Sequence, residues 1–454
     1  MSASRDRLAC FKAYDIRGRV PDELDRDLAF RIARAYAAFV GPKRVAVGRD
    51  IRLTSPEISG AVRDGLEASG VDVVDIGECG TEMVYFATFH LGLDGGVMVT
   101  ASHNPVDYNG LKLVREGGRP ISADTGLLEI ERRVLAGELG ASAGRGRTER
   151  VDVVPAYVDH LLAYVDAANL PPLRVVVNAG NGGAGAIVDR LEGRLPLRFV
   201  KLLHEPDGRF PNGVPNPLLP ENRKVTAEAV LRERADVGIA WDGDFDRCFL
   251  FDERGEFIEG YYIVGLLACH ALQRHAGARI VHDPRLTWNT IEVVRECGGV
   301  PVQSKSGHAF MKEVMRREDA VYGGEMSAHH FFREFSYCDS GMIPWLIALD
   351  ILRATGKPLS QLVGERMRRF PASGEINRRV SDAAGAIRKL KEAYGPKALR
   401  IDETDGVGIE FERWRFNLRA SNTEPLIRLN VEARGDAALV QEKTREILAA
   451  LEGA

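Results

Sequence analysis

The sequence predicts an α/β protein with three related mixed α/β domains and a C-terminal α+β domain. A unit of strand, polar turn, helix and strand occurs three times, over 44–76, 173–202 and 278–303. Repetition of such a unit is typical of βαβ architecture. From about Pro371 the pattern changes to a strand, a helix, three short strands and a final helix, which is typical of an antiparallel sheet covered by helices.

The first domain begins with a polar–apolar alternation at Tyr14–Gly18, which indicates a strand or its exit, and a helical periodicity over Asp22–Phe39. The segment Thr54-Ser55-Pro56-Glu57 is typical of a capping box with proline in the first turn, so we expect a helix from there to Gly70. The strands on either side of this helix are expected at Arg44–Asp50 and Val71–Ile76.

The same periodicities predict the elements of the second and third copies of this unit and of the C-terminal domain. The expected strands are Leu173–Asn178, Leu197–Leu202, Ala278–Asp283 and Val300–Gln303, and the expected helices are Ala184–Leu191, one ending near Gly298, Asp382–Tyr394 and Ala437–Leu451. These elements divide the chain into domains at 1–150, 151–253, 254–370 and 371–454.

Composition excludes several classes of protein. A net charge of −4 over 454 residues provides no basic excess for binding nucleic acid. The six cysteines are scattered without a C-x-x-C pair, so free thiols in a reducing compartment are expected. The first residues lack an apolar leader, and the most apolar segment, Tyr261–Leu272, is too short to span a membrane. We therefore expect a cytoplasmic protein that binds neither nucleic acid nor membranes.

A serine follows a buried strand at Gly96–Val99, within Thr100-Ala101-Ser102-His103-Asn104-Pro105. Open α/β sheets bind their ligands at the carboxyl ends of strands, and Pro105 ends the strand. His103 and Asn104 could handle a proton or donate a hydrogen bond. An ordinary polar turn is the alternative interpretation.

Three carboxylates follow the apolar strand Val237–Trp241, in Asp242-Gly243-Asp244-Phe245-Asp246-Arg247. In an extended segment they project to one side, where a divalent cation would offset their repulsion and oxygen ligands favour Mg²⁺. A calcium loop is the competing interpretation, with Glu253 at its twelfth position. Arg247 replaces the glycine that such a loop needs at position six, and an acidic surface loop is the other alternative.

Three further loops carry possible ligand-binding residues. Gly180–Gly185 matches the dinucleotide pattern G-x-G-x-x-G, although a tight strand-to-helix turn is the favoured interpretation. Gly323–His330 contains a carboxylate and a hydroxyl two residues apart, Glu325 and Ser327, which suit a polyol; a structural loop is the alternative. Arg419-Ala420-Ser421-Asn422-Thr423-Glu424-Pro425, with Arg428, combines guanidinium, hydroxyl and amide donors that suit a phosphate, although a surface turn could also carry them.

Taken together in chain order, these loops resemble those of the α-D-phosphohexomutase family of bacterial phosphomannomutases and phosphoglucomutases. The resemblance covers essentially the whole chain and implies four domains around a central cleft. Thr100–Pro105 is similar to the family's active-site serine loop, Asp242–Arg247 to its magnesium loop, Gly324–His330 to the sugar-binding loop of mannose-capable members, and Arg419–Pro425 to its phosphate-binding loop. In this family the turn at Gly180 lies between the first strand and the first helix of the second domain, so the resemblance implies a structural role for its glycines.

The resemblance implies a mechanism in which phospho-Ser102 transfers its phosphoryl group to a hexose phosphate. A hexose 1,6-bisphosphate forms, turns around and returns its other phosphate to the serine. The resemblance implies Mg²⁺ bound by Asp242, Asp244, Asp246 and an oxygen of phospho-Ser102. The resemblance implies catalytic roles for Ser102, His103, Lys112, Arg17, Arg247 and His308. It implies that substrate is bound by Tyr14, Arg285, Glu325, Ser327, His329, Arg419, Ser421, Asn422, Thr423 and Arg428.

The expected reaction interconverts mannose 6-phosphate and mannose 1-phosphate, and extends to glucose phosphates. Arg285 stands where mannose-capable relatives often carry lysine, so its contact with substrate is open. The alternatives are a glucose-specific mutase, a phosphoglucosamine mutase, and an inactive sugar-phosphate binder. We expect a monomer or a weak homodimer.

Overall fold

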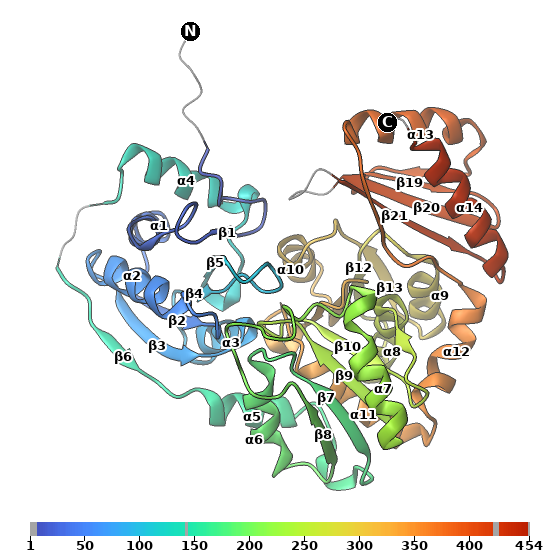
Figure 1. The fold of residues 1–454 in the computed structure, drawn as a ribbon, viewed down its shortest axis with the longest axis horizontal. Coiled ribbons are helices and arrows are strands. Elements are labelled where there is room, and N and C mark those ends of the chain that lie inside the picture. The colour runs from blue at the N-terminus through green and yellow to red at the C-terminus, as the bar shows by residue number, and fades with distance from the viewer. Residues whose placement is uncertain (1–6, 141–143, 421–425, 453–454) are drawn as a thin grey trace. The chain divides into compact units, whose positions relative to one another are not determined.

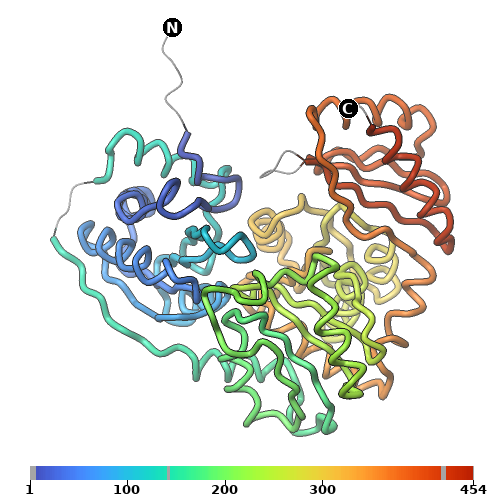
Figure 2. Tube along the Cα trace, in the orientation of Figure 1, coloured from blue at the N-terminus to red at the C-terminus, as the bar shows by residue number. Residues whose placement is uncertain are grey.

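The computed structural model describes residues 7–140, 144–420 and 426–452. It divides into two compact units: 1–257 with 334–354, and 258–333 with 355–454. The ribbon and the chain trace are drawn in Figures 1 and 2. Each unit is described separately below.

The first unit contains two sheets. In one, the strands run in the order β1-β5-β4-β2-β3-β6. Strand β4 is parallel to β2 and antiparallel to β5, and β2 is parallel to β3. The strands are β1 (Ile16–Arg19), β2 (Arg44–Arg49), β3 (Asp72–Glu78), β4 (Gly95–Val99), β5 (Tyr108–Arg115) and β6 (Thr148–Arg150).

Helices cover both faces of this sheet. Valines at alternate positions, Val45, Val47, Val97 and Val99, are buried in one core with residues of α1, α2 and α4. On the opposite face Gly96 lies against α3, where an added Cβ would come within 2.7 Å of Val84. The helices are α1 (Arg26–Val40), α2 (Ser55–Glu67), α3 (Thr81–His90) and α4 (Leu127–Ala136).

The second sheet of this unit has the order β11-β10-β9-β7-β8, with β7 parallel to both β8 and β9 and β10 antiparallel to β9. Its strands are β7 (Arg174–Asn178), β8 (Arg198–Leu202), β9 (Val237–Trp241), β10 (Cys248–Phe251) and β11 (Phe257–Ile258), where the chain passes to the second unit. The remaining elements of the first unit are α5 (Val154–Leu162), α6 (Ala184–Glu192), α7 (Lys224–Glu233), β16 (Cys338–Asp339) and α11 (Ile343–Thr355).

The second unit contains a mixed sheet and an antiparallel sheet. In the mixed sheet β12 is parallel to β13 and β14, and β14 is antiparallel to β15. Its elements are α8 (Gly260–Arg274), β12 (Arg279–His282), α9 (Trp288–Glu296), β13 (Val300–Gln303), α10 (His308–Arg317), β14 (Tyr322–Gly324), β15 (His330–Phe332) and α12 (Leu359–Arg369).

The antiparallel sheet has the order β17-β21-β20-β19-β18. Its apolar face, which includes Phe416, Leu418 and Val431, is buried in one core with α13 and α14. The elements are β17 (Ile376–Arg379), α13 (Ala383–Tyr394), β18 (Arg400–Asp402), β19 (Val407–Glu410), β20 (Trp414–Ala420), β21 (Leu426–Ala433) and α14 (Ala437–Ala450). Short 3₁₀ helices lie at Glu116–Gly118, Ala123–Thr125, Ala167–Asn169, Pro220–Asn222, Arg333–Phe335 and Gly395–Lys397.

The predicted α/β class is confirmed, and three local expectations outside the candidate site were wrong. Four strands, rather than three, follow α13, because β18 is only three residues long and carries a weak alternation. Thr54 makes no side-chain capping bond to α2; its backbone is already helical, and its hydroxyl instead accepts a hydrogen bond from Asn109. Cys269 and Cys297 form a disulfide, because the packing of α8 against α9 brings their Cα atoms to 5.6 Å.

The remaining four cysteines are free and buried. Within the described ranges, no helix is both long enough and apolar enough to cross a membrane.

Candidate active site

Ser102 lies just beyond the end of β4, where the sequence predicted it, and its side chain is buried. Its φ of 50° is left-handed, which is uncommon for a residue with a Cβ. The backbone around it is held by Arg52, a residue that the sequence did not single out. Its guanidinium donates to the carbonyls of Ser102 (2.9 Å), Asn104 (2.6 Å), Pro105 (2.7 Å) and Tyr108 (3.0 Å).

The three aspartates follow β9 in a turn, not in the extended segment that we expected. The amide of Phe245 donates to the carbonyl of Asp242 at 3.1 Å, and the φ of Phe245 is 46°. Gly80 gives the Phe245 ring its space, since a Cβ there would come within 2.2 Å of the ring. The turn reverses the chain so that β10 can return antiparallel to β9.

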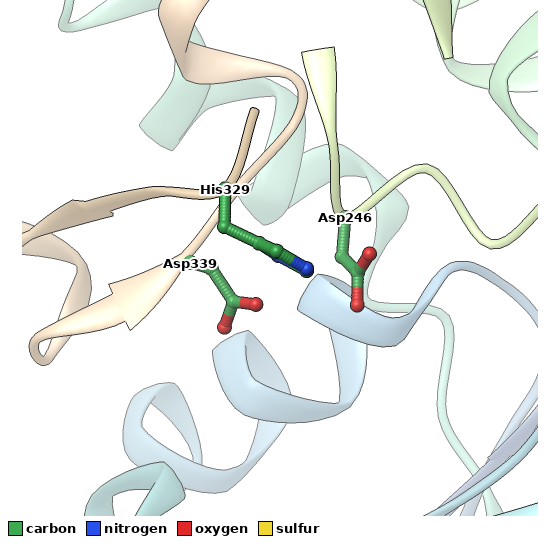
Figure 3. A group of neighbouring side chains, drawn as sticks. All are labelled: Asp246, His329 and Asp339. Carbon is green, nitrogen blue, oxygen red and sulfur yellow. The ribbon is translucent and has the colours of Figure 1, made fainter. Parts of the chain in front are cut away.

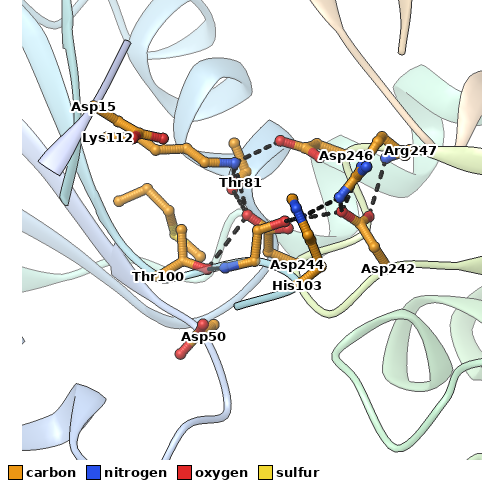
Figure 4. Close-up of polar contacts among 12 residues, drawn as sticks. Asp15, Asp50, Thr81, Thr100, His103, Lys112, Asp242, Asp244, Asp246 and Arg247 are labelled. Carbon is orange, nitrogen blue, oxygen red and sulfur yellow. Dashed lines mark hydrogen bonds and ion pairs between the residues drawn. The ribbon is translucent and has the colours of Figure 1, made fainter. Parts of the chain in front are cut away.

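Residues far apart in the sequence meet at this turn (Figure 4). The Ser102 hydroxyl donates to Asp242 Oδ2 at 2.9 Å. The Lys112 ammonium, from β5, donates to Oδ2 of Asp244 at 2.7 Å and to Oδ2 of Asp246 at 2.6 Å. All five residues belong to the first unit and are buried.

The aspartate group fits a divalent cation. One oxygen from each of Asp242, Asp244 and Asp246 lies within 4.8 Å of the others. Among the residues that the structure describes, Oδ1 of Asp244 is buried and has no hydrogen-bond partner. A buried carboxylate oxygen without a donor is costly, and a hard cation such as Mg²⁺ would satisfy it.

Asp339 is another buried carboxylate of the same unit, at the end of β16, and it extends this acidic region. One of its oxygens lies within 4.8 Å of an oxygen of Asp246 (Figure 3). Asp339 is not predicted from the sequence, since nothing in its neighbouring residues distinguishes it.

Basic groups balance the acidic ones. Burial alone would raise the pKa of Asp244, but Lys112 and Thr81 hold it well below its ordinary value. Burial alone would lower the pKa of Lys112, but Asp244 and Asp246 raise it. Lys112 is therefore charged at neutral pH without a metal ion.

His103 lies beside the serine and is neutral. Burial, together with the neighbouring Arg247 and Arg17, lowers the pKa of its imidazole well below the ordinary value. Arg247 contacts its Nδ1, and a guanidinium can only donate, so Nδ1 is the acceptor. The Ser102 hydroxyl, 3.1 Å from the same nitrogen, therefore donates to Asp242 instead.

The two predicted arginines of this unit lie at the same site. Arg247 donates to Asp242 Oδ2 through Nε at 2.8 Å. Arg17, on β1, donates to Asp15 Oδ2 at 2.8 Å and to Asn104 Oδ1 at 2.7 Å. Tyr14 lies in the segment before β1 and is half-buried.

Glu82 is a fully buried glutamate that the sequence analysis also missed. Its carboxylate accepts from the hydroxyls of Tyr157 (2.5 Å) and Ser340 (2.6 Å) and from the amides of Gly341 (2.6 Å) and Met342 (3.3 Å). The amides precede α11, so the carboxylate lies at the N-terminus of that helix. Burial raises the pKa of Glu82 to about 8, although these hydrogen bonds lower it in part.

The second unit holds the predicted sugar-binding residues around Arg285. Its Nη2 donates to Asp283 Oδ2 at 2.7 Å, to Ser327 Oγ at 3.2 Å and to Glu325 Oε1 at 3.3 Å. Glu325 also accepts from the amide of Gly307 at 2.8 Å, and in the described part of the chain its buried Oε2 has no partner. Burial raises the pKa of Glu325 even though Arg285 lowers it.

The predicted phosphate-binding arginines surround Glu375, another residue that the sequence analysis missed. Arg419 and Arg428 are paired across β20 and β21. Glu375 lies 3.4 Å from Arg419, 3.6 Å from Arg428 and 3.4 Å from Arg285. Burial opposes ionisation of Glu375, but Arg285, Arg428 and Arg419 hold its pKa below the ordinary value. Ser421, Asn422 and Thr423 lie outside the described residues.

The remaining predicted histidines are also in this unit. The rings of His308, the first residue of α10, and His329 have centroids 6.1 Å apart. The turn at Gly180, by contrast, packs on the aspartate loop of the first unit, since the amide of Gly183 donates to the carbonyl of Gly243. A structural role accounts for its glycines.

The fold and this site are typical of a class of phosphoryl-transfer enzyme, with a serine beside a loop of three aspartates that could hold a metal ion. Four family models match the chain in order, described as phosphoglucomutase/phosphomannomutase α/β/α domains I, II and III, over residues 9–140, 155–255 and 259–370, and the C-terminal domain, over 375–450. The chain belongs to the phosphoglucomutase/phosphomannomutase family, and it is a phosphohexomutase.

Relatives match over nearly the whole chain. A phosphomannomutase of Salmonella montevideo is 58% identical over 98% of this chain and 99% of its own length. Phosphohexose mutases of Xanthomonas campestris are 60% identical over 98% of this chain and 100% of their own. A crystal structure of a phosphoglucomutase/phosphomannomutase family protein from Burkholderia thailandensis superposes with a TM-score of 0.88 at 36% identity, covering 98% of each chain.

Proposed function

We propose that this phosphohexomutase interconverts mannose 6-phosphate and mannose 1-phosphate, acts on glucose phosphates as well, and works through phospho-Ser102 and a hexose 1,6-bisphosphate. The observation that carries the proposal is the 2.9 Å hydrogen bond between the Ser102 hydroxyl and Asp242, in a buried cluster of three aspartates. A hydroxyl beside such a cluster suits phosphoryl transfer.

Asp242, Asp244 and Asp246, with an oxygen of phospho-Ser102, would hold Mg²⁺. When bound, Mg²⁺ neutralises negative charge on the transferring phosphoryl group. Arg52 fixes the backbone of Ser102. The Oγ atom of Ser102 would therefore stay in one position while the phosphoryl group leaves and returns.

Transfer to the sugar also requires proton movement. The free hydroxyl of the hexose phosphate loses its proton as its oxygen bonds to phosphorus and the bond from phosphorus to Ser102 Oγ breaks. His308 or the neutral His103 would accept this proton, and Lys112, which is charged, would supply the proton that the leaving Ser102 Oγ takes up. Arg17 and Arg247 would stabilise the charge that develops on the phosphoryl oxygens.

The second unit would bind the rest of the substrate. Glu325 and Ser327 would form hydrogen bonds with two sugar hydroxyls, and His329, Arg285 and Tyr14 are the other residues predicted to bind the sugar phosphate. Arg419, Arg428, Ser421, Asn422 and Thr423 would bind the distal phosphate. Arg419→Ala should mainly raise KM, because the distal phosphate is bound in both half-reactions.

Support for mannose comes from the relatives named phosphomannomutase. A glucose-specific mutase, a phosphoglucosamine mutase and an inactive binder remain the alternatives. We also propose four domains at 1–150, 151–253, 254–370 and 371–454, a monomer or weak homodimer, and a cytoplasmic location. The four free buried cysteines support that location, whereas the Cys269–Cys297 disulfide does not.

The test is ³¹P NMR of mannose 1-phosphate incubated with the protein, Mg²⁺ and a trace of glucose 1,6-bisphosphate. Glucose 1-phosphate and glucosamine 1-phosphate are assayed in parallel. We expect the 6-phosphate signal from mannose, and none with Ser102→Ala or after chelation of the metal. Conversion of glucosamine 1-phosphate alone, or full activity of Ser102→Ala, would refute the proposal.

A further inference from the structure

Thr81 is a buried residue of the first unit whose hydroxyl lies between two groups of the site (Figure 4). It begins α3, 163 residues before Asp244 in the chain. Its Oγ1 is 2.5 Å from Asp244 Oδ2 and 3.1 Å from the Lys112 Nζ. No local sequence pattern marks this threonine as part of the site.

The donors and acceptors at this hydroxyl have one consistent arrangement. A lysine ammonium can only donate, so Thr81 accepts from Lys112 and donates its single proton to Asp244. Asp244 Oδ2 thereby takes hydrogen bonds from Thr81, from Lys112 at 2.7 Å and from Thr100 at 3.3 Å. Three donors meet one carboxylate oxygen, while Oδ1, among the described residues, receives none.

The backbone of the same residue holds the same loop. The Thr81 amide donates to the carbonyl of Asp244 at 3.1 Å. The preceding Gly80 lies against the Phe245 ring. The start of α3 therefore fixes both the main chain and the side chain of Asp244.

We propose that Thr81 is a positioning residue that orients the Asp244 carboxylate, with Oδ2 held by the protein and Oδ1 directed to the divalent cation. The inference rests on the magnesium site of the proposed function. Groups that orient metal ligands typically contribute a factor of roughly 10 to 100 in metal affinity. Loss of the hydroxyl also leaves one of the three Lys112 protons without its acceptor.

The experiment measures binding of Mg²⁺ alone to the purified full-length protein by isothermal titration calorimetry. Thr81→Val removes the hydroxyl at nearly constant volume, and Thr81→Ser restores it. Thr88→Val is the matched control, since Thr88 is equally buried on α3 but its hydroxyl donates to the carbonyl of Val84, at 2.7 Å, rather than to a carboxylate. Circular dichroism checks folding, and Thr81→Ala replaces the valine variant if that variant does not fold.

We expect Mg²⁺ affinity roughly 10- to 100-fold weaker in Thr81→Val, and close to the wild-type value in Thr81→Ser and Thr88→Val. In the mutase assay, the Mg²⁺ concentration for half-maximal rate should rise by the same factor. Wild-type affinity in folded Thr81→Val, or equal losses in Thr81→Val and Thr88→Val, would overturn the positioning role while leaving the proposed function intact. Absence of Mg²⁺ binding by the wild-type protein would overturn both.

Discussion

Glu82→Gln should make the stability of the protein less dependent on pH, because Glu82 is a buried carboxyl group with a raised pKa. Its pKa is about 8 in the folded protein, against an ordinary value of 4.5. Burial disfavours the ionised form, and the donors from Tyr157, Ser340, Gly341 and Met342 offset only part of this effect. The folded protein therefore retains a proton that the unfolded chain releases.

The direction and magnitude follow from proton linkage. Since the folded-state pKa is the higher one, the contribution to stability is complete below pH 4.5 and is lost as the pH rises toward 8. Between these values the loss is about 1.4 kcal/mol per pH unit. From pH 5 to pH 7.5 the group should therefore cost the wild-type protein about 3 kcal/mol in the free energy of unfolding.

Glutamine cannot ionise, and it keeps the shape of the side chain and one acceptor oxygen. Urea unfolding of wild-type and Glu82→Gln proteins, followed by circular dichroism at pH 5, 6.25 and 7.5, measures the difference. The wild-type protein should lose about 3 kcal/mol more than the variant across this range. Equal pH dependence of the free energy of unfolding in the two proteins would refute the reasoning. A wild-type protein that gains stability relative to the variant as the pH rises would show that the pKa of Glu82 is lowered, not raised.

Three further predictions concern the serine and aspartate loops. Ser102→Ala and Ser102→Gly should both be inactive. The glycine variant should be more stable than the alanine variant by about 1 kcal/mol in urea unfolding, because a φ of 50° strains any residue with a Cβ. Equal stabilities of the two variants would contradict this strain. Gly80→Ala should lower the free energy of unfolding by about 1–3 kcal/mol, because the added Cβ clashes with the Phe245 ring. Gly193→Ala is the control, since a Cβ there meets nothing within 4 Å. Similar losses of stability in both variants would argue against tight packing at Gly80. Mg²⁺ at 100 times its Kd should stabilise the wild-type protein by about 2.7 kcal/mol in thermal or urea unfolding. Asp244→Asn should abolish this stabilisation. An undiminished stabilisation of the Asp244→Asn variant would place the cation elsewhere.

The start of α3 contacts both the aspartate loop and the segment Ser340–Met342 of the first unit. Thr81 bonds to Asp244, and the next residue, Glu82, binds the segment Ser340–Met342. That segment packs on the aspartate loop as well, since a Cβ on Gly341 would come within 2.3 Å of the Phe245 carbonyl. Two consecutive residues, Thr81 and Glu82, thus restrain the aspartate turn from two sides.

The sequence by itself determined the fold class and the positions of the main loops. Both follow from local information: apolar periodicity identified β4 and β9, and the residues that follow each strand are contiguous in the chain. The aspartates Asp242, Asp244 and Asp246 are recognisable for the same reason, because the three carboxylates lie within five residues.

Local patterns failed where a distant partner competes for the same atoms. The hydroxyl of Thr54 could cap α2, yet it accepts a hydrogen bond from Asn109. Alternate aspartates could form an extended segment, yet the chain turns at Phe245 so that β10 can pair with β9. Cys269 and Cys297 carry no spacing signal, because only the packing of α8 on α9 brings them together.

Only the tertiary structure decided which residues support the site. Arg52, Thr81, Glu82 and Glu375 act on groups that are 50 to 260 residues away or lie on other strands, and nothing in their neighbouring sequence identifies them. The physical reason is that burial and hydrogen-bond partners belong to the folded chain. The chemistry of a loop can be inferred from its own residues, whereas the orientation of each side chain depends on the atoms packed around it.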